Sequence, residues 1–376
     1  MNGRERLLAA FAGEEPDRVP FAPDIDLVAM QWWHVTTGKP WWKAYLYGDP
    51  PVGDIYIDAN RALNCDIWDY WHHISIKQPN RCKTKALQET NRGIDVRTSI
   101  ETPHGTLSER NFYPCDSPPW CLERRLKSIE EDWPKVKWLM EQETFDTRIV
   151  PEPVVGERGI TEIGPTLFPD FWVSLRGSER ALVDFIRSPE MIDEIFGYYR
   201  EYVIAHTECC LRANPDAILI QGSASSMSLI SPSTYRRYSL PLVKEITRLC
   251  RRADIPSHQH TCGKSRQLVQ MNYEETDLDV MEPLEGPPTG DIDLAEVKGK
   301  YGERLCLKGN INTVVLLQED QNTIRRTVRK AIEDTAPGGG FVLSTGDSPG
   351  ANTPYDNIME MVVSAREYGG YRDLSF

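Results

Sequence analysis

From about residue 178 onward, short apolar stretches alternate with amphipathic helical segments, and few folds accommodate that pattern. The helical segments carry clear start signals, such as Ser188-Pro189 and Ser231-Pro232, where serine caps the helix and proline takes its first position. The expected strands are 217–221, 255–260, 278–282, 305–310 and 341–346. Because each strand is followed by a helix, we expect parallel pairing through right-handed crossovers.

Two α/β architectures fit this alternation, a closed (β/α)8 TIM barrel and an open doubly wound sheet. A doubly wound sheet usually carries a glycine-rich phosphate turn after an early strand. The N-terminal half contains no such turn, and Gly338 to Gly340 precede a strand instead of following one. We therefore predict a (β/α)8 barrel that forms a single domain over residues 1–376.

The N-terminal part has a different character. Its first helix is clear, because Asn2 and Glu5 have the spacing of a capping box and Leu7, Leu8 and Phe11 form one apolar stripe. The rest, up to about residue 135, is rich in Trp, Pro and Tyr and lacks clean periodicity. We expect 1–135 to be a helical or irregular elaboration and lid, and 136–376 to form most of the barrel.

The negative charge of the chain limits the kinds of partner that it is expected to bind. The formal net charge is −13, which disfavours binding to a nucleic-acid backbone or an anionic membrane surface. No apolar run is long enough to span a bilayer, and the first residues lack the apolar core of a signal peptide. The cysteines form no CxxC pair. We expect a cytoplasmic protein with reduced thiols that acts on a small molecule.

Polar side chains stand at the ends of five successive expected strands. In a barrel, the working residues come from the carboxyl ends of the strands, where the βα loops meet at one mouth. We expect the mouth to be lined by Gln221, by His258, His260 and Cys262, by Glu282, by Asn310 and by Asp347. Of these, Gln221, Glu282 and Asn310 are the candidates for direct contact with substrate.

His260 and Cys262 form the most informative pair. Residues two apart in an extended chain point to the same side, so this imidazole and this thiol can hold one ion. Zn²⁺ suits mixed nitrogen and sulfur ligands, and a catalytic zinc usually has three protein ligands and an open position. Asp347 is our first choice for the third ligand, with His258 and Glu282 as alternatives. The competing interpretation is a hydrogen-bonded core histidine beside a buried thiol.

The tryptophans suggest a further property. All of them except Trp172 fall within residues 32–138. They either pack an irregular lid against the barrel or form a pocket for a flat, aromatic substrate.

In these residues the chain resembles the uroporphyrinogen decarboxylase superfamily, and in particular its corrinoid-linked zinc methyltransferases. The resemblance rests on the order and spacing of RERL (4–7), GEEPDRVP (13–20), GPT (164–166), LRG (175–177), LISP (229–232), HTCG (260–263), KGNI (308–311), LSTG (343–346), and Thr353-Pro354 with Asn357. It implies a (β/α)8 barrel in which an HxC pair and a later cysteine hold zinc. His260 and Cys262 match the pair, whereas the residue after Gly346 is Asp347 instead of cysteine.

The resemblance implies a zinc-dependent methyltransferase that moves a methyl group between a small substrate and a cobalamin carried by a separate corrinoid protein. The substrate it implies is a methyl ether, aromatic ethers included, or a thiol. Aspartate is a harder ligand than cysteine and suits an oxygen substrate better. One alternative is porphyrinogen decarboxylation with Asp24 or Asp26 at the pyrroles, although the arginine-rich motif of the decarboxylases is absent. Another is a noncatalytic barrel that binds a corrinoid or tetrapyrrole.

Overall fold

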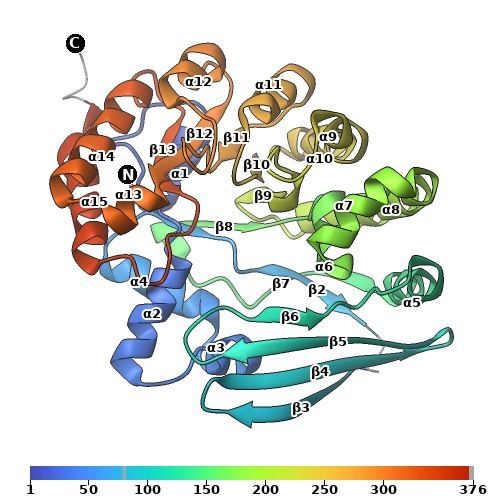
Figure 1. The fold of residues 1–376 in the computed structure, drawn as a ribbon. Helices are drawn as coiled ribbons and strands as arrows, with labels where there is room; N and C mark the ends of the chain where they lie inside the picture. The colour runs from blue at the N-terminus through green and yellow to red at the C-terminus, as the bar shows by residue number, and fades with distance from the viewer. Residues whose placement is uncertain (79–81, 372–376) are drawn as a thin grey trace.

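The computed structural model of the chain describes residues 1–78 and 82–371. At its centre lies a parallel sheet with the strand order β1, β8, β9, β10, β11, β12, β13. The sheet curls around, and helices surround its outer face (Figure 1). The predicted α/β class with parallel pairing is thus confirmed. The strands are β1 (Ile67–Asp69), β8 (Gly159–Ile163), β9 (Ala217–Gln221), β10 (Ser257–His260), β11 (Val280–Glu282), β12 (Cys306–Asn312) and β13 (Phe341–Gly346).

The five expected strands are all present, with small differences at their ends. β9 and β13 have the predicted bounds, whereas β10 begins after Pro256, which has no N–H group to donate to a neighbour. Sequence analysis did not predict β1 or β8, because both are short and lie beside the aperiodic N-terminal tract.

A further segment joins the two ends of the sheet. On one side of it, Ala22 N donates to Leu343 O at 3.0 Å, and Leu343 N donates to Pro20 O at 2.9 Å. On the other side, Asp66 N donates to Phe21 O at 2.9 Å. Hydrogen bonding therefore continues from β13 through Pro20 to Ala22 and on to the residue that precedes β1.

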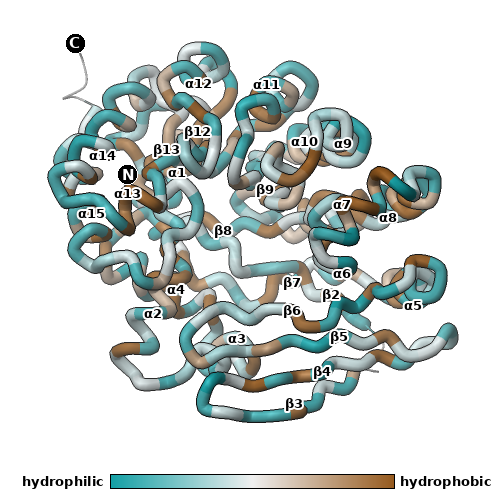
Figure 2. The backbone as a smooth tube through the Cα atoms, in the orientation of Figure 1, coloured by the Kyte–Doolittle hydropathy of each residue, from teal (hydrophilic) through white to brown (hydrophobic). Residues whose placement is uncertain are grey.

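The outer helices follow the strands and begin where the sequence signals predicted. α8 and α9 start at their prolines, and Ser231 caps α9 through its hydroxyl. In Figure 2 the helix faces turned away from the sheet are largely hydrophilic. These helices are α6 (Phe168–Arg176), α7 (Ser178–Arg187), α8 (Pro189–Arg212), α9 (Pro232–Tyr238), α10 (Leu240–Ala253), α11 (Arg266–Glu275), α12 (Leu294–Tyr301), α13 (Thr313–Gln318), α14 (Gln321–Thr335) and α15 (Tyr355–Tyr368).

The N-terminal tract is more regular than predicted. It holds α2 (Asp26–Thr37), α3 (Trp42–Tyr47) and α4 (Val52–Ala62), and then two antiparallel sheets inserted between β1 and β8. One sheet pairs β2 (His73–Lys77) with β7 (Thr144–Val150), and α5 (Ile129–Gln142) precedes β7. The other contains β3 (Cys82–Thr90), β4 (Gly93–Thr102), β5 (Gly105–Pro114) and β6 (Trp120–Glu123). Every residue of β3 is exposed, so this strand shows none of the apolar alternation by which a strand is predicted.

The first helix seals one end of the curled sheet. α1 (Gly3–Phe11) has the predicted capping box between Asn2 and Glu5. Its residues Leu7 and Phe11 belong to the same buried cluster as Val280 and Cys306, which begin β11 and β12. The amino-terminal ends of the strands are therefore covered, which leaves the carboxyl ends for chemistry. Among the described residues, none of the helices combines the length and the apolar character that crossing a membrane requires.

Asp66 holds the joining segment in place. Its buried carboxylate is 2.5 Å from Arg6 and 2.9 Å from Arg18, and it also accepts a hydrogen bond from Phe21 N at 3.0 Å. We expect Asp66→Ala to lower the free energy of unfolding by about 2–3 kcal/mol, because Phe21 N loses its buried acceptor and Arg6 keeps only Asp17 as its carboxylate partner. Denaturant titration measures this loss. Asp58→Ala, which removes an exposed ion pair with Arg61, is the control and should cost at most about 1 kcal/mol. Equal losses would show that the Asp66 contacts are unimportant.

Candidate metal centre

The parallel strands bring the predicted side chains to one rim. In the sheet register, His260 of β10 lies between Gln221 of β9 and Glu282 of β11. Asn310 lies on β12, and Asp347 directly follows β13. The rim of carboxyl ends therefore carries all five positions, as the strand-end argument predicted.

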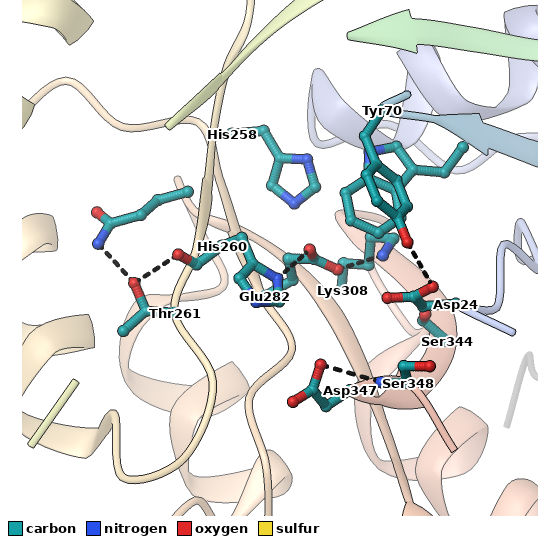
Figure 3. Close-up of polar contacts among 12 residues, drawn as sticks. Asp24, Tyr70, His258, His260, Thr261, Glu282, Lys308, Ser344, Asp347 and Ser348 are labelled. Atoms are coloured by element: carbon teal, nitrogen blue, oxygen red, sulfur yellow. Dashed lines mark hydrogen bonds and ion pairs between the residues drawn. The ribbon is translucent and has the colours of Figure 1, made fainter. Parts of the chain in front are cut away.

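His260 is held in an orientation that suits metal binding. Its Nδ1 lies 2.8 Å from Glu282 Oε1 (Figure 3). Since a carboxylate only accepts, Nδ1 carries the proton, and Nε2 is the nitrogen left for a metal. Burial lowers the pKa of His260, but hydrogen bonds to Cys262 and Glu282 and the charges of Glu282 and Asp347 outweigh it and raise the pKa well above its ordinary value. The negative charges of Glu282 and Asp347 that favour a second proton on the ring would also favour a metal cation beside it.

Cys262 lies beside two carboxylates. One potential ligand atom from each of Cys262, Glu285 and Asp347 lies within 4.8 Å of the others. Gly263 turns the chain here at φ +79°, and its N–H donates to Glu285. Asp347 has φ +86°, a conformation that costs a residue with a Cβ of the order of 1 kcal/mol and is often kept at functional sites. The structure thus brings Asp347, our first choice for the third ligand, to Cys262.

Sequence reasoning missed Glu285. It follows β11 after the Glu282–Pro283 bond, where the chain leaves the sheet, and Leu284 has φ +57°. The strand alternation used to select inward-facing residues no longer applies beyond that turn. The only sequence signal was an acidic residue close behind a strand end.

Lys308 is a second residue that sequence analysis did not assign. Its side chain is 1% exposed, and its ammonium forms an ion pair with Glu282, opposite the oxygen that contacts His260. The ammonium also lies 3.5 Å from the centroid of the Trp68 ring. Burial raises the pKa of Glu282, but Lys308 and His260 outweigh it and hold the pKa well below its usual range. Lys308 therefore keeps Glu282 charged as the acceptor for His260.

His258, the alternative ligand, lies deeper in the sheet. Its side chain is fully buried, and Nδ1 lies 2.9 Å from Glu162 Oε2. Trp68 Nε1 donates to the same Glu162 oxygen at 2.8 Å. His258 thus belongs to an interior hydrogen-bond network, and the expectation that it lines the mouth is wrong. Neither His258 nor His260 is a member of the group formed by Cys262, Glu285 and Asp347. A hydrogen bond to Cys262 places His260 beside that group.

Asn310 and Gln221, the remaining candidates for contact with substrate, differ in how accessible their side chains are. Asn310 donates from Nδ2 to Leu284 O at 2.7 Å, which ties β12 to the turn after β11. Gln221 is exposed and lines a cavity of 460 Å³. Gln221 is therefore open to a ligand, while Glu282 acts through His260. Their roles in catalysis stay predictions.

The structure also shows the positions of Asp24 and Asp26, the two aspartates expected at the pyrroles in the decarboxylase alternative. Asp24 is 8% exposed and accepts a hydrogen bond from Tyr70 OH at 2.8 Å. Burial raises the pKa of Asp24 well above its ordinary value, and the nearby charge of Asp26 adds to this. Asp26 accepts a hydrogen bond from Ser348, next to Asp347. Both carboxyl groups thus lie beside the candidate metal centre.

The family model of "Uroporphyrinogen decarboxylase (URO-D)" matches residues 171–368, which include His260, Cys262 and Asp347. Methylcobamide:CoM methyltransferase MtaA of Methanosarcina barkeri is 27% identical over 188 residues, which are 49% of this chain and 51% of the relative. Uroporphyrinogen decarboxylase of Trichodesmium erythraeum is 24% identical over 184 residues, 48% of each chain. The chain thus spans about half the length of the curated relatives it matches.

A solved structure is similar over nearly the whole chain. A methyltransferase from Methanosarcina mazei superposes with a TM-score of 0.63 at 17% sequence identity, covering 98% of this chain and 99% of that one. At this identity the likeness shows the fold alone. The curled seven-stranded sheet and its surrounding helices are therefore a fold that this chain shares with the M. mazei methyltransferase.

The ion pair of Lys308 with Glu282 generates a test of stability. We expect Lys308→Met to lower the free energy of unfolding by about 3–5 kcal/mol, because it leaves a buried carboxylate without its main partner. The double variant Lys308→Met/Glu282→Gln should lose clearly less, since no buried charge remains. Denaturant titration of both variants decides the point. Equal losses would mean that the charge of Glu282 does not depend on Lys308.

The buried carboxyl group of Asp170 predicts a pH dependence of protein stability. It lies in the first turn of α6 and accepts hydrogen bonds from Ala224 N at 2.6 Å and Ser225 Oγ at 2.8 Å. Burial raises the pKa of Asp170 from 3.8 to about 6. The folded state therefore binds this proton more tightly, so the stability from Asp170 is fully present below pH 3.8 and is lost as the pH rises through about 6.

Asp170→Asn should flatten this part of the pH profile, because the amide does not titrate; its oxygen can accept from Ala224 N, and its NH2 group can donate to Ser225 Oγ. Unfolding free energies measured between about pH 4 and pH 7 test this expectation. The exposed substitution Asp58→Asn is the matched control. An unchanged slope in Asp170→Asn would contradict the assignment.

Proposed function

Since the chain belongs to the uroporphyrinogen decarboxylase (URO-D) family, we propose that it is a zinc-dependent methyltransferase acting between a small substrate and a corrinoid protein. The observation that carries the proposal is the meeting of Cys262, Asp347 and Glu285 beside the oriented His260. Nitrogen, sulfur and carboxylate oxygen are the ligand types that zinc takes in proteins. We also count Pro20 to Ala22 as an eighth strand and infer a closed (β/α)8 barrel.

The donor set fits zinc in a specific way. Glu282 fixes the ring of His260, as a carboxylate commonly does behind a metal-binding histidine. We assign Cys262, Asp347 and Nε2 of His260 as ligands, with Glu285 in reach of the same position. Zinc bound there would act as a Lewis acid on a substrate oxygen or lower the pKa of a substrate thiol.

Asp347 distinguishes between these two uses. A carboxylate is a harder ligand than a thiolate and donates less electron density to the metal, so the zinc stays more electrophilic. A set with one sulfur and one or two carboxylates therefore favours activation of an oxygen substrate. The methyl carbon then leaves that oxygen, which keeps the electron pair of the broken bond and takes a proton. The acceptor supplies the pair for the new bond.

The acceptor in this proposal is a reduced corrinoid carried by a separate protein. The choice is supported by the M. barkeri relative, which is named a methylcobamide methyltransferase. The partner docks at the rim, because α1 covers the opposite end of the strands. Gln221, the open polar side chain beside His260, faces the substrate.

Porphyrinogen decarboxylation ranks second. Several matched relatives are decarboxylases, and it would need no metal. However, Asp24 is buried and hydrogen-bonded to Tyr70, and a rim carrying Asp26, Glu285 and Asp347 would repel a substrate with many carboxylates. Carbon dioxide release from uroporphyrinogen by the chelator-treated protein would favour this alternative. Tight corrinoid or tetrapyrrole binding without turnover would favour a noncatalytic barrel.

Metal analysis tests the proposed centre. We expect the purified protein to carry about one zinc per chain and Cys262→Ser to carry almost none, because the sulfur ligand is lost. Cys250→Ser is a matched control, since Cys250 is fully buried on α10, outside the centre. Near-zero zinc in all three proteins would overturn the assignment.

Activity is tested with zinc-loaded and chelator-treated protein. With substrate and reduced corrinoid protein present, we expect methylation of the corrinoid, followed by its visible spectrum, only in the zinc-loaded sample. Equal rates in the two samples would remove the metal from the mechanism.

A further inference from the structure

The insertion between β1 and β8 leaves the barrel and returns to it at one place. β1 ends at Asp69, β2 begins at His73, and β7 ends at Val150, which is the register partner of His73. His72 and Pro151, which flank this pair, therefore lie at the base of the insertion. We call Asp69, His72 and Pro151 the basal cluster.

The ring of His72 contacts both other members of the basal cluster. Its Nε2 lies 2.5 Å from Asp69 Oδ2, and its Nδ1 lies 2.8 Å from the carbonyl oxygen of Pro151. The His72 side chain is 2% exposed, and the Asp69 side chain is fully buried. The imidazole thus joins the end of β1 to the segment that follows β7.

Both contacts of the ring are with hydrogen-bond acceptors. A neutral imidazole has one N–H group and one bare nitrogen, so it can donate to only one of the two. With a proton on each nitrogen, the ring donates to the Asp69 carboxylate and to the Pro151 carbonyl at the same time. The geometry of the basal cluster therefore calls for His72 as an imidazolium ion, which is paired with a buried carboxylate.

The charges around the basal cluster agree with a protonated ring. Burial lowers the pKa of His72, but the hydrogen bond and charge of Asp69, the Pro151 carbonyl and the charge of Asp54 outweigh it and raise the pKa above 6.5. Burial and the charge of His72 lower the pKa of the neighbouring His73. The titratable groups around His72 are Asp69 on β1, Tyr45 on α3, Asp54 on α4 and His73 on β2.

The insertion that the basal cluster anchors also packs against the rim of the barrel. The cavity of 460 Å³ has Ile76 of β2 and Leu139 of α5 in its wall, together with Gln221 at the rim. β2 starts directly after the basal cluster. A change at the base therefore alters how the insertion lies against Gln221.

We propose that the basal cluster is a pH-sensitive clasp that holds the insertion against the barrel. When His72 loses its second proton, one of its two hydrogen bonds is lost and the buried Asp69 carboxylate loses its counter-charge. The base then opens more often, and the cavity wall beside Gln221 loosens. Because the folded-state pKa of His72 is raised, this stabilisation is fully present below pH 6.5 and is lost as the pH rises through the raised pKa.

This inference concerns the position of the insertion and depends neither on the metal centre nor on the proposed methyl transfer. Nitrogen NMR of full-length protein with ¹⁵N-labelled histidine tests the proton count. The signals of His72 are identified as those that disappear in His72→Gln. We expect both ring nitrogens to carry protons at about pH 7. A ring with one bare nitrogen at that pH would overturn the proposal.

Amide hydrogen exchange tests the opening. After correction for the intrinsic effect of pH on exchange, we expect the protection of β2 and β7 to fall by about tenfold between about pH 6 and pH 9. β9, in the parallel sheet, should keep its protection. In Asp69→Asn the same fall should occur at lower pH, because the carboxylate that holds the proton is gone. His104→Gln, at an exposed position of the same insertion, is the matched control and should behave as the wild type.

If His72→Gln does not fold, the wild-type pH series and Asp69→Asn still decide the question. Constant protection of β2 and β7 across the pH series would show that the ring does not hold the base. An equal fall in β9 would place the effect in the whole fold. An unshifted fall in Asp69→Asn would assign the titration to another group. Each of these three results would overturn the proposal.

Discussion

The buried carboxylate of Glu282 connects the interior of the sheet with its rim. One of its oxygens pairs with Lys308 inside, and the other orients His260 outside. Burying a charge costs several kcal/mol unless it is paired and hydrogen-bonded, so neither partner can be removed without consequence. Because Lys308 keeps Glu282 ionised, His260 presents one defined nitrogen to the rim. The candidate metal centre depends on this arrangement.

The fold supplies the other half of the centre. Parallel strands end at one edge, so Cys262 beyond β10 and Asp347 beyond β13 meet there, with His260 beside Cys262. α1 covers the opposite edge, and Asp66 joins Phe21 to the start of β1. The covered interior of the curled sheet allows Lys308, Glu162 and His258 to be buried with partners. The inserted sheets then add a cavity beside the rim instead of a simple lid.

Prediction from sequence succeeded where a residue's role depends on local pattern. Apolar strands followed by helices specified β9 and β13, and the same pattern correctly placed His260, Cys262 and Asp347 at or just beyond strand ends. It failed where the role depends on distant partners. Lys308 stood in an apolar strand with nothing to indicate the facing Glu282, and Glu285 lay beyond the turn that ends the strand alternation. β3, exposed on both faces, left no pattern at all.

X-ray absorption at the zinc edge on the purified protein tests the central claim most directly. We expect one sulfur at about 2.3 Å and nitrogen or oxygen ligands at about 2.0–2.2 Å. Cys262→Ser should give almost no zinc signal, because the variant is expected to lose the metal. A wild-type spectrum without any sulfur ligand would contradict the account, because Cys262 would then not hold the metal.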